Sequence, residues 1–204
     1  MSKEYHYDLV IVGGGPAGSS AAYAAAKNGV KVALIEKEDS IAETVRTSGV
    51  TWIESIKEFG IPENCYNPIK NFSFSSPNNE VTIKDSVATA AVLDVRKTYR
   101  WLVNEAEKMG ADVFVKTNIN DVIKNNDGDI IGVKGIGING KITFHSKIII
   151  DATGFTSTIS KAMGLVTQWE RFGAGAEYEA EVENADADTW WLMVGQEYTP
   201  AGYA

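Results

Sequence analysis

The chain is poor in cysteine and histidine, and it has no excess of basic residues. Cys65 is the only cysteine, so an intrachain disulfide and a Cys-x-x-Cys redox pair are both excluded, together with enzymes that reduce disulfides through such a pair. The two histidines, His6 and His145, are isolated, and no ligand spacing indicates a metal site. Lysine and arginine number 19 against 27 acidic residues, a net charge of −8, which argues against nucleic-acid binding.

Long apolar runs are also missing. No run is long enough to span a bilayer, and residues 1–6 lack the pattern of a signal peptide. We therefore expect a cytoplasmic protein and leave a peripheral contact with a membrane open. The length of 204 residues predicts one domain, or one domain and part of another.

A glycine-rich turn with the pattern G-x-G-x-x-G lies near the start of the chain, at residues 13–18. The apolar run 7–12 before it is typical of a buried parallel strand, and the alanine-rich run 19–26 after it favours a helix. Such glycines let the backbone approach a pyrophosphate, and the helix N-terminus supplies free N–H groups and a positive dipole. A second strand, 31–35, ends at Glu36, whose carboxylate can accept hydrogen bonds from a ribose and would repel a 2′-phosphate. These features predict a site for an adenine dinucleotide.

The same pattern occurs again at residues 135–140, GIGING, but in a different context. Strand-like sequence lies on both sides of it, at 130–134 and 141–145, and Asn139-Gly140 is a dipeptide typical of a type I′ hairpin turn. No helix opens there, so no helix dipole would point at a phosphate. We predict a hairpin here and a single nucleotide site in the chain.

The rest of the chain alternates between helical and extended patterns. Helices are expected at 50–59 and 95–109. Strands are expected at 71–75, 80–84, 112–116 and 146–154, with a meander over 119–145. The first two strands flank Ser-Pro-Asn-Asn and predict a hairpin. Strand-like segments from about Phe172 onward, including 189–194, indicate the start of a second sheet.

GGGPAGSSAA with Glu36, and the later segment IIIDATGFTSTISKAMG, resemble the FAD-dependent geranylgeranyl reductase family. That family shares its fold with para-hydroxybenzoate hydroxylase-like monooxygenases and flavin halogenases. The resemblance covers most of residues 5–204 and corresponds to the N-terminal half of the family. It implies an α/β fold with a Rossmann-type, glutathione-reductase-like three-layer ββα domain for FAD at 1–165. A hairpin inserted at about 68–92 would belong to the substrate side, and 166–204 would begin an antiparallel substrate-domain sheet, apparently truncated.

The resemblance also implies cofactor contacts. The candidate residues are Gly13, Gly15, Pro16, Ala17, Gly18, Glu36, Lys37, Arg46, Ser48, Gly49, Arg96, Ile119, Asp151 and Gly154. Arg46 lies where the family has a loop beside the flavin, although it could equally be a surface arginine. Arg96 comes one residue later than the arginine of the family's Leu-Asp-Arg pattern. Ile119 would touch the adenine through its backbone. Asp151 and Gly154 would lie at the cofactor's edge, or Asp151 would only cap the following turn.

The implied function is a FAD-dependent oxidoreductase that reduces isoprenoid, geranylgeranyl-type, carbon–carbon double bonds of a lipid. The electron donor would be NAD(P)H (NADH or NADPH) or a ferredoxin. The sequence does not reveal which residue would be the catalytic proton donor. Two alternatives stay open. One is a flavin-dependent monooxygenase or halogenase. The other is an inactive nucleotide-binding fragment of a split or truncated flavoprotein, because the chain ends before the family's Tyr-x-Trp-x-Phe-Pro and later Gly-Asp motifs.

Overall fold

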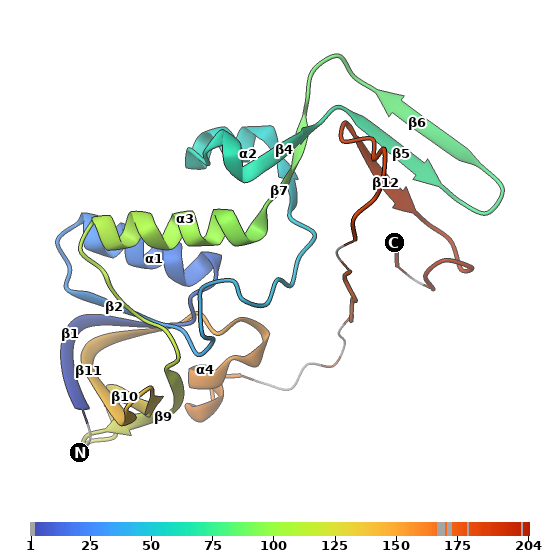
Figure 1. The fold of residues 1–204 in the computed structure, drawn as a ribbon. Coiled ribbons are helices and arrows are strands. Elements are labelled where there is room, and N and C mark those ends of the chain that lie inside the picture. Colours follow the sequence, from blue (N-terminus) through green and yellow to red (C-terminus); the bar gives the residue numbers. More distant parts are fainter. Residues whose placement is uncertain (1–2, 167–169, 171–172, 179, 201) are drawn as a thin grey trace. The chain divides into compact units, whose positions relative to one another are not determined.

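A computed structural model describes residues 3–166, 170, 173–178, 180–200 and 202–204. The chain forms two compact units (Figure 1). The first contains Met1–Val45 and Tyr99–Ala174, and the second contains Arg46–Thr98 and Gly175–Ala204. The boundaries of these units differ from those of the expected domains, 1–165 and 166–204. The assignment of the expected domains to cofactor and substrate stays a prediction. Among the helices that the structure describes, none has the length and apolar character to cross a membrane.

The first unit is built on a six-stranded sheet with the order β8-β2-β1-β11-β10-β9. Its strands are β1 (Lys3–Val12), β2 (Val32–Ile35), β8 (Asp112–Phe114), β9 (Asn118–Lys124), β10 (Ile130–Gly137) and β11 (Gly140–Asp151). The four neighbouring strands β8, β2, β1 and β11 are parallel to one another, whereas β10 and β9 are antiparallel to their neighbours. The helical elements are α1 (Pro16–Lys27), α3 (Val95–Lys108, which begins in the second unit), η2 (Gly154–Thr156) and α4 (Thr158–Ala162).

Strand β1 explains the three layers of this unit, because its apolar side chains are buried on both faces of the sheet. Leu9 and Ile11 belong to one core cluster with residues of α1 and α3, which lie side by side (Figure 1). Val10 and Val12 belong to another cluster with residues of β9 and β10. A run of consecutive apolar residues is what a strand covered on both faces requires. The predicted α/β class, with a parallel sheet between helices and a meander, is confirmed.

Strand β11 is longer than expected. The sequence suggested one strand at 141–145 and another at 146–154, whereas the structure has a single strand of 12 residues. Strand β1 pairs with it in parallel from Lys3↔Ile142 to Val12↔Asp151. The polar Ser146 looked like a boundary, but its hydroxyl donates a hydrogen bond to the backbone carbonyl of Ile148 at 2.6 Å, so the strand continues.

The GIGING segment forms the predicted hairpin, but the predicted turn type is wrong. Gly137 pairs with Gly140, so the two residues between the strands are Ile138 and Asn139 rather than Asn139 and Gly140. A type I′ turn needs positive φ at both central residues. Here Ile138 and Asn139 have negative φ, and the left-handed position is Gly140, with φ of +101°. A glycine in that position directly after a two-residue turn is the pattern of a hairpin with a glycine bulge.

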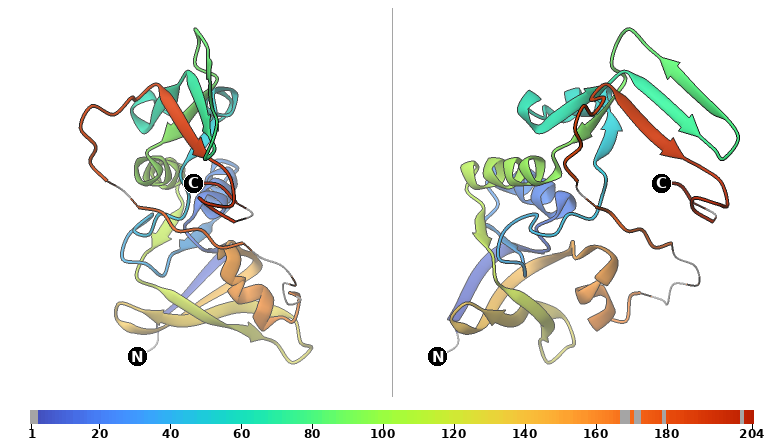
Figure 2. Two further views of the ribbon diagram at one scale, coloured as in Figure 1. Left: turned by 90° about the vertical axis from the view of Figure 1, so that its right-hand side faces the viewer. Right: turned by 45° about the vertical axis from the view of Figure 1, so that its right-hand side comes forward.

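The second unit contains two three-stranded sheets, β12-β5-β6 and β3-β7-β4 (Figure 2). Its elements are β3 (Val50–Trp52), α2 (Ile53–Phe59), η1 (Glu63–Cys65), β4 (Tyr66–Ile69), β5 (Asn71–Ser75), β6 (Glu80–Lys84), β7 (Ala90–Leu93) and β12 (Thr189–Met193). Strands β5 and β6 form the predicted antiparallel hairpin. The helix expected at 50–59 begins only at Ile53, because Val50–Trp52 pairs with β7.

Strand β12 differs from the expectation in its direction. It pairs in parallel with β5, so this sheet is mixed rather than purely antiparallel. A tight hairpin forces antiparallel pairing, but β12 follows β6 only after a long connection, which permits either direction. Phe172, where strand-like sequence was expected to begin, lies outside the described residues.

Candidate dinucleotide-binding site

Three of the four glycines in the turn at residues 13–18 serve different purposes. Gly13 has φ of +112°, and a Cβ atom there would collide with the carbonyl oxygen of Ala152. A Cβ atom on Gly18 would collide with the carbonyl oxygen of Gly13. Both glycines therefore permit close packing inside the protein. Gly15 is different, because no atom lies within 4 Å of the position its Cβ atom would take. The space beside Gly15 is open to a ligand.

This open space adjoins the N-terminus of α1. Gly15 is the N-cap residue and has no side chain to satisfy the first N–H groups, and Pro16 follows at the first helical position. The first turn of the helix contains no acidic residue. The N–H groups of Ala17 and Gly18 precede the first helical hydrogen bond, from Ser19 N to Gly15 O at 2.9 Å. A helix end of this kind favours an anion, and phosphate above all.

Glu36 is connected to the turn by its side chain. Its Oε2 accepts a hydrogen bond from the backbone N–H of Gly14 at 2.8 Å, and its Oε1 accepts one from the N–H of Glu38 at 2.9 Å. Each carboxylate oxygen can accept further hydrogen bonds, so ribose hydroxyls can still donate to Glu36. The structure thus brings Glu36 and the turn together as the sequence predicted, while the ribose contact itself stays a prediction. Lys37 next to it is exposed.

Ile119 lies near the start of β9, where its side chain is buried in the core. The segment before it is joined to the end of β2, since Thr117 N donates to Glu36 O at 2.9 Å and Lys116 N donates to Glu38 O at 2.8 Å. The backbone of Ile119 is therefore two residues from a segment bonded directly to Glu36. Its expected contact with adenine stays a prediction.

Asp151 is engaged by its own turn. Oδ1 accepts hydrogen bonds from the N–H and hydroxyl of Thr153 at 3.1 and 2.6 Å, and Oδ2 accepts from the N–H and hydroxyl of Ser160, both at 2.7 Å. Burial raises the pKa of Asp151, but these hydrogen bonds outweigh burial and leave the pKa below its usual value. The geometry supports the capping role that the sequence left open. Gly154, with φ of +64°, opens the short helix η2 within this turn.

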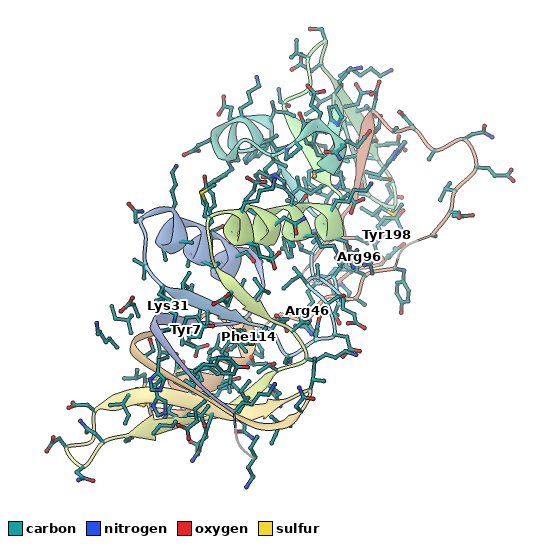
Figure 3. All side chains as sticks on the ribbon, turned by 60° about the vertical axis from the view of Figure 1, so that its left-hand side comes forward. Tyr7, Lys31, Arg46, Arg96, Phe114 and Tyr198 are labelled. Carbon is teal, nitrogen blue, oxygen red and sulfur yellow. The ribbon has the colours of Figure 1, made fainter. Side chains whose placement is uncertain are left out.

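The other four candidates, Arg46, Ser48, Gly49 and Arg96, belong to the second unit. Gly49 has φ of +75°, and a Cβ atom there would lie 2.8 Å from the carbonyl oxygen of Leu93, so Gly49 is needed for packing. Arg46 and Ser48 are exposed and Arg96 is partly buried near the start of α3 (Figure 3). The N-cap of α3 is Asp94, whose Oδ1 accepts from Lys97 N at 3.0 Å. The cofactor contacts of these four residues stay predictions.

A contact that the sequence did not reveal links three strands of the first unit. Tyr7 in β1 donates a hydrogen bond to Oδ2 of Asp112 in β8 at 2.8 Å, and the ammonium of Lys31, next to β2, lies 4.9 Å from the Tyr7 ring centre (Figure 3). Burial raises the pKa of Tyr7, and the bond to Asp112 raises it further. This group stabilises the sheet that carries the turn.

Within the part of the chain that the structure describes, no cluster of three or more His, Cys, Asp or Glu side chains could hold a metal.

The family model of FAD dependent oxidoreductases matches residues 8–187, which include the turn, Glu36 and Asp151. The chain belongs to this family. FAD is accordingly the cofactor that the family indicates, and the residues of the turn fit its adenosine diphosphate half. The open space at Gly15, the helix end without acidic residues and the acceptor Glu36 are the features that this half requires.

Among curated proteins, this member of the FAD dependent oxidoreductase family is similar to the digeranylgeranylglycerophospholipid reductase of Methanocaldococcus jannaschii. The two are 37% identical over 204 residues, covering 97% of this chain and 51% of that protein. An uncharacterised protein in the nifH2 5′ region of Methanosarcina barkeri is 32% identical, over 81% of this chain and 91% of that protein. The chain thus spans about half the length of the reductases that it matches.

Among solved structures, a geranylgeranyl bacteriochlorophyll reductase-like protein from Thermoplasma acidophilum has a TM-score of 0.80 and 27% identity, covering 98% of this chain and 53% of that one. The resemblance to geranylgeranyl reductases is thereby confirmed. A myxobacterial chondrochloren halogenase, with a TM-score of 0.64 and 21% identity, covers 78% of this chain and 39% of that one. At that identity the halogenase shows the shared fold alone.

Proposed function

We propose that this protein binds FAD at the turn of residues 13–18 and reduces carbon–carbon double bonds of an isoprenoid lipid. The observation that supports the binding site is the contrast between the glycines. The protein's own backbone fills the space beside Gly13 and Gly18, whereas the space beside Gly15, at the N-terminus of α1, is empty to 4 Å. A packing glycine needs a close neighbour, and Gly15 has none.

The chain's own residues bind and orient the cofactor in this proposal. The N–H groups at the start of α1 bind the pyrophosphate, and Glu36 binds the ribose while holding Gly14 in place. The family resemblance is what supports Arg46, Ser48, Gly49 and Arg96 as further cofactor contacts. Bound FAD supplies the hydride chemistry that amino acid side chains cannot.

The substrate and the electron donor follow from the relatives and from the second glycine motif. The relatives named as reductases of digeranylgeranylglycerophospholipid indicate a lipid with isoprenoid chains as the substrate class. The GIGING segment is a hairpin, so the turn at residues 13–18 is the single nucleotide-binding turn of the described residues. In this proposal FAD occupies that turn. The donor is therefore a transiently bound NAD(P)H or a ferredoxin. The protein acts from the cytoplasm in peripheral contact with the lipid's membrane.

The test uses purified protein loaded with FAD and then reduced with dithionite without oxygen. Incubation with digeranylgeranylglycerophospholipid should reoxidise the flavin, and mass spectrometry should show two hydrogens gained per double bond. If air is then admitted to the reduced protein, reoxidation that yields a hydroxylated or halogenated product would instead support a monooxygenase or a halogenase. Stoichiometric FAD binding without lipid reduction would support the proposed binding site but refute the proposed reaction for this chain.

A further inference from the structure

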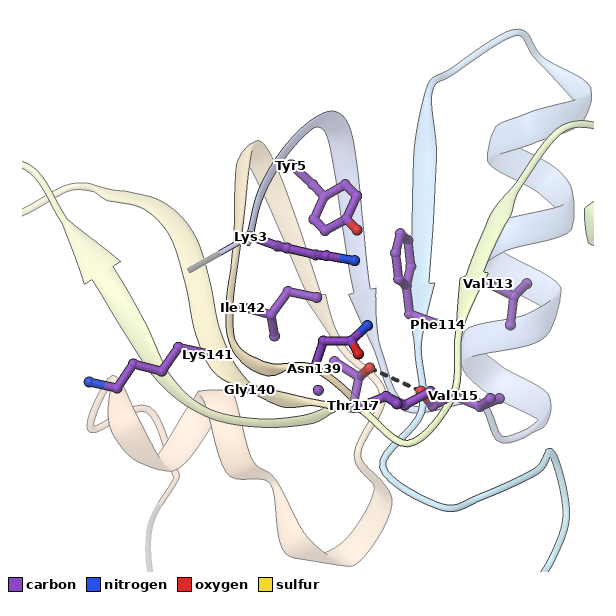
Figure 4. Close-up of a pocket in the computed structure, with 12 residues that line it drawn as sticks. Lys3, Tyr5, Val113, Phe114, Val115, Thr117, Asn139, Gly140, Lys141 and Ile142 are labelled. Carbon is purple, nitrogen blue, oxygen red and sulfur yellow. Dashed lines mark hydrogen bonds between the residues drawn. The ribbon is translucent and has the colours of Figure 1, made fainter. Parts of the chain in front are cut away.

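The GIGING hairpin lines a small pocket that contains none of the candidate FAD residues. The pocket has a volume of about 210 Å³, and its walls come from the start of β1, the end of β8 and the hairpin tip, residues 137–142 (Figure 4). This volume is too small for a dinucleotide and suits a molecule with one ring.

Three polar side chains point into this pocket, two from β1 and one from the turn of the hairpin. They are the Lys3 ammonium, the Tyr5 hydroxyl and the Asn139 amide (Figure 4). Within the described part of the chain, none of these three groups has a hydrogen-bond or ion-pair partner. Thr117 differs, because its hydroxyl donates to the Val115 carbonyl at 3.0 Å. Three polar groups that converge without partners are free to bind a ligand.

The remaining walls are apolar and aromatic. Phe114 packs edge-on against Tyr5 with ring centres 5.1 Å apart, and Tyr5 stacks on Phe144 at 5.3 Å. These ring contacts fix the Tyr5 ring, so its hydroxyl has a defined position. Ile142 adds a buried aliphatic surface. An apolar wall with a few convergent polar groups is the usual composition of a small-molecule site.

We propose that this pocket binds a small aromatic carboxylate, with the carboxylate at Lys3 and the ring against Phe114. The ammonium selects an anion, and Tyr5 and Asn139 supply neutral hydrogen bonds to the same group. This site lies beyond the proposed FAD function and does not depend on it.

Benzoate is the probe, and binding is followed by the NMR shifts of the backbone amides of Thr117 and Gly140 and the side-chain amide of Asn139. We expect saturable binding of benzoate, with weaker binding of benzamide, which lacks the charge, and of acetate, which lacks the ring. Lys3→Met should weaken benzoate binding about fivefold, as for a partly exposed charge pair. Tyr5→Phe should weaken it by a smaller factor, because only a neutral hydrogen bond is lost.

The matched control is Lys141→Met, since Lys141 lies at the pocket's edge in the same hairpin, but its side chain points away from Lys3, Tyr5 and Asn139 (Figure 4). This variant should bind benzoate as the wild type does, and so should Gly15→Ala, which disables only the FAD site. Saturating ADP should not displace benzoate. The proposal fails if benzoate gives no saturable shifts, if acetate binds equally well, or if the two lysine variants lose equal affinity.

Discussion

The backbone N–H of Gly14 donates a hydrogen bond of 2.8 Å to Oε2 of Glu36, and so joins the glycine-rich turn to the end of β2. The other oxygen of Glu36 accepts from the N–H of Glu38. Both bonds use a carboxylate oxygen as the acceptor. Glu36 therefore shapes the turn before any ligand arrives, in addition to its proposed contact with the ribose.

Glu36→Gln is predicted to lower both FAD affinity and the stability of the turn. A glutamine side chain has one acceptor oxygen and one NH₂ donor, so one of the two backbone N–H groups would face a donor. The proposed ribose contact would lose its charged acceptor as well, at a cost of about 1.5–3 kcal/mol, which corresponds to at least about tenfold in affinity for FAD or ADP. Isothermal calorimetry measures the affinity. Glu38→Gln is the control, since the glutamine oxygen can still accept from Thr44 N, which lies 3.1 Å from Glu38 Oε2. Unchanged affinity in Glu36→Gln would remove Glu36 from the site.

Gly15→Ala is predicted to abolish FAD binding while the protein still folds. Gly15 has φ of −71° and an open Cβ position, so alanine fits the backbone and the methyl group fills the space proposed for the pyrophosphate. Stability should fall by only about 1 kcal/mol, because alanine is a poorer N-cap residue than glycine. Equilibrium dialysis with FAD, together with urea unfolding, separates the two effects.

The matched control for Gly15→Ala is Gly137→Ala, in the other glycine motif. Gly137 lies in an extended strand, and its Cβ atom would meet Thr117 Oγ1 at 3.4 Å, an ordinary contact. FAD affinity should therefore stay within about twofold of the wild type, in the range of surface substitutions. Equal losses of FAD affinity in the two folded variants would contradict a single dinucleotide site.

Asp151→Asn is predicted to destabilise the first unit in a pH-dependent manner. The pKa of Asp151 is lower in the folded protein than in the unfolded chain, so the ionised carboxylate stabilises the fold above the unfolded pKa. This contribution is lost as pH falls through the folded pKa, below about 4. At pH 7 the variant should lose about 2 kcal/mol, from hydrogen bonds to a charged group.

Urea unfolding at pH values from 7 down to 3 measures this difference. The gap between wild type and Asp151→Asn should narrow as the pH falls below about 4. Asp127→Asn is the control, because Asp127 is an exposed turn residue, and its effect should be small at every pH. A gap that stays constant with pH would mean that the charge of Asp151 does not contribute to stability.

Local features of the sequence were sufficient to predict the cofactor-binding core. The apolar run of β1, the glycines, the alanines of α1 and the position of Glu36 all lie within residues 7–36, so their relation depends on short-range geometry. Long-range pairing was harder to predict. The length of β11 depends on β1, about 140 residues earlier, as in Lys3↔Ile142, and the direction of β12 depends on β5, as in Thr189↔Asn71.

Side-chain hydrogen bonds within the site were also beyond the sequence. Nothing in the motif shows that Gly14 donates to Glu36, or that Asp151 is satisfied by Thr153 and Ser160. Residue types indicate which groups can bond, whereas the partners depend on where the chain turns. The prediction of the GIGING turn type failed for the same reason, since Asn139-Gly140 fits two registers, which only the strand pairing and the φ angles separate.

Gly140→Ala is predicted to destabilise the hairpin by about 1–2 kcal/mol, the cost of a left-handed backbone for an alanine. The cause is conformational, because no atom lies within 4 Å of the Cβ position on Gly140. Asn139→Ala should change stability little, since the φ of Asn139 is negative. Thermal unfolding measures both. A loss in Asn139→Ala as large as that in Gly140→Ala would support the type I′ register that the structure contradicts.

One face of the β12-β5-β6 sheet is apolar on all three strands. Register pairs Phe72 with Ile83 and Trp190, and the Phe72 and Trp190 rings meet edge-on with centres 5.8 Å apart. Two residues further along β5, on the same face, Phe74 pairs with Val81 and Leu192. Val81 is 58% exposed and Ile83 is 57% exposed. An exposed apolar face of this kind promotes association.

We predict that the purified chain self-associates and that Val81→Thr combined with Ile83→Thr weakens this association. Threonine keeps the β-branched shape that suits a strand, so the fold should persist while apolar area is removed from the face. Full burial of one such side chain contributes about 1.5–3 kcal/mol, so the association constant should fall by about tenfold or more. Sedimentation velocity over a range of concentrations measures it. Ile136→Thr, at a 50% exposed position in β10, makes the same chemical change elsewhere and should leave association unchanged. If it reduces association as much as the double variant does, the sheet face is not the surface involved.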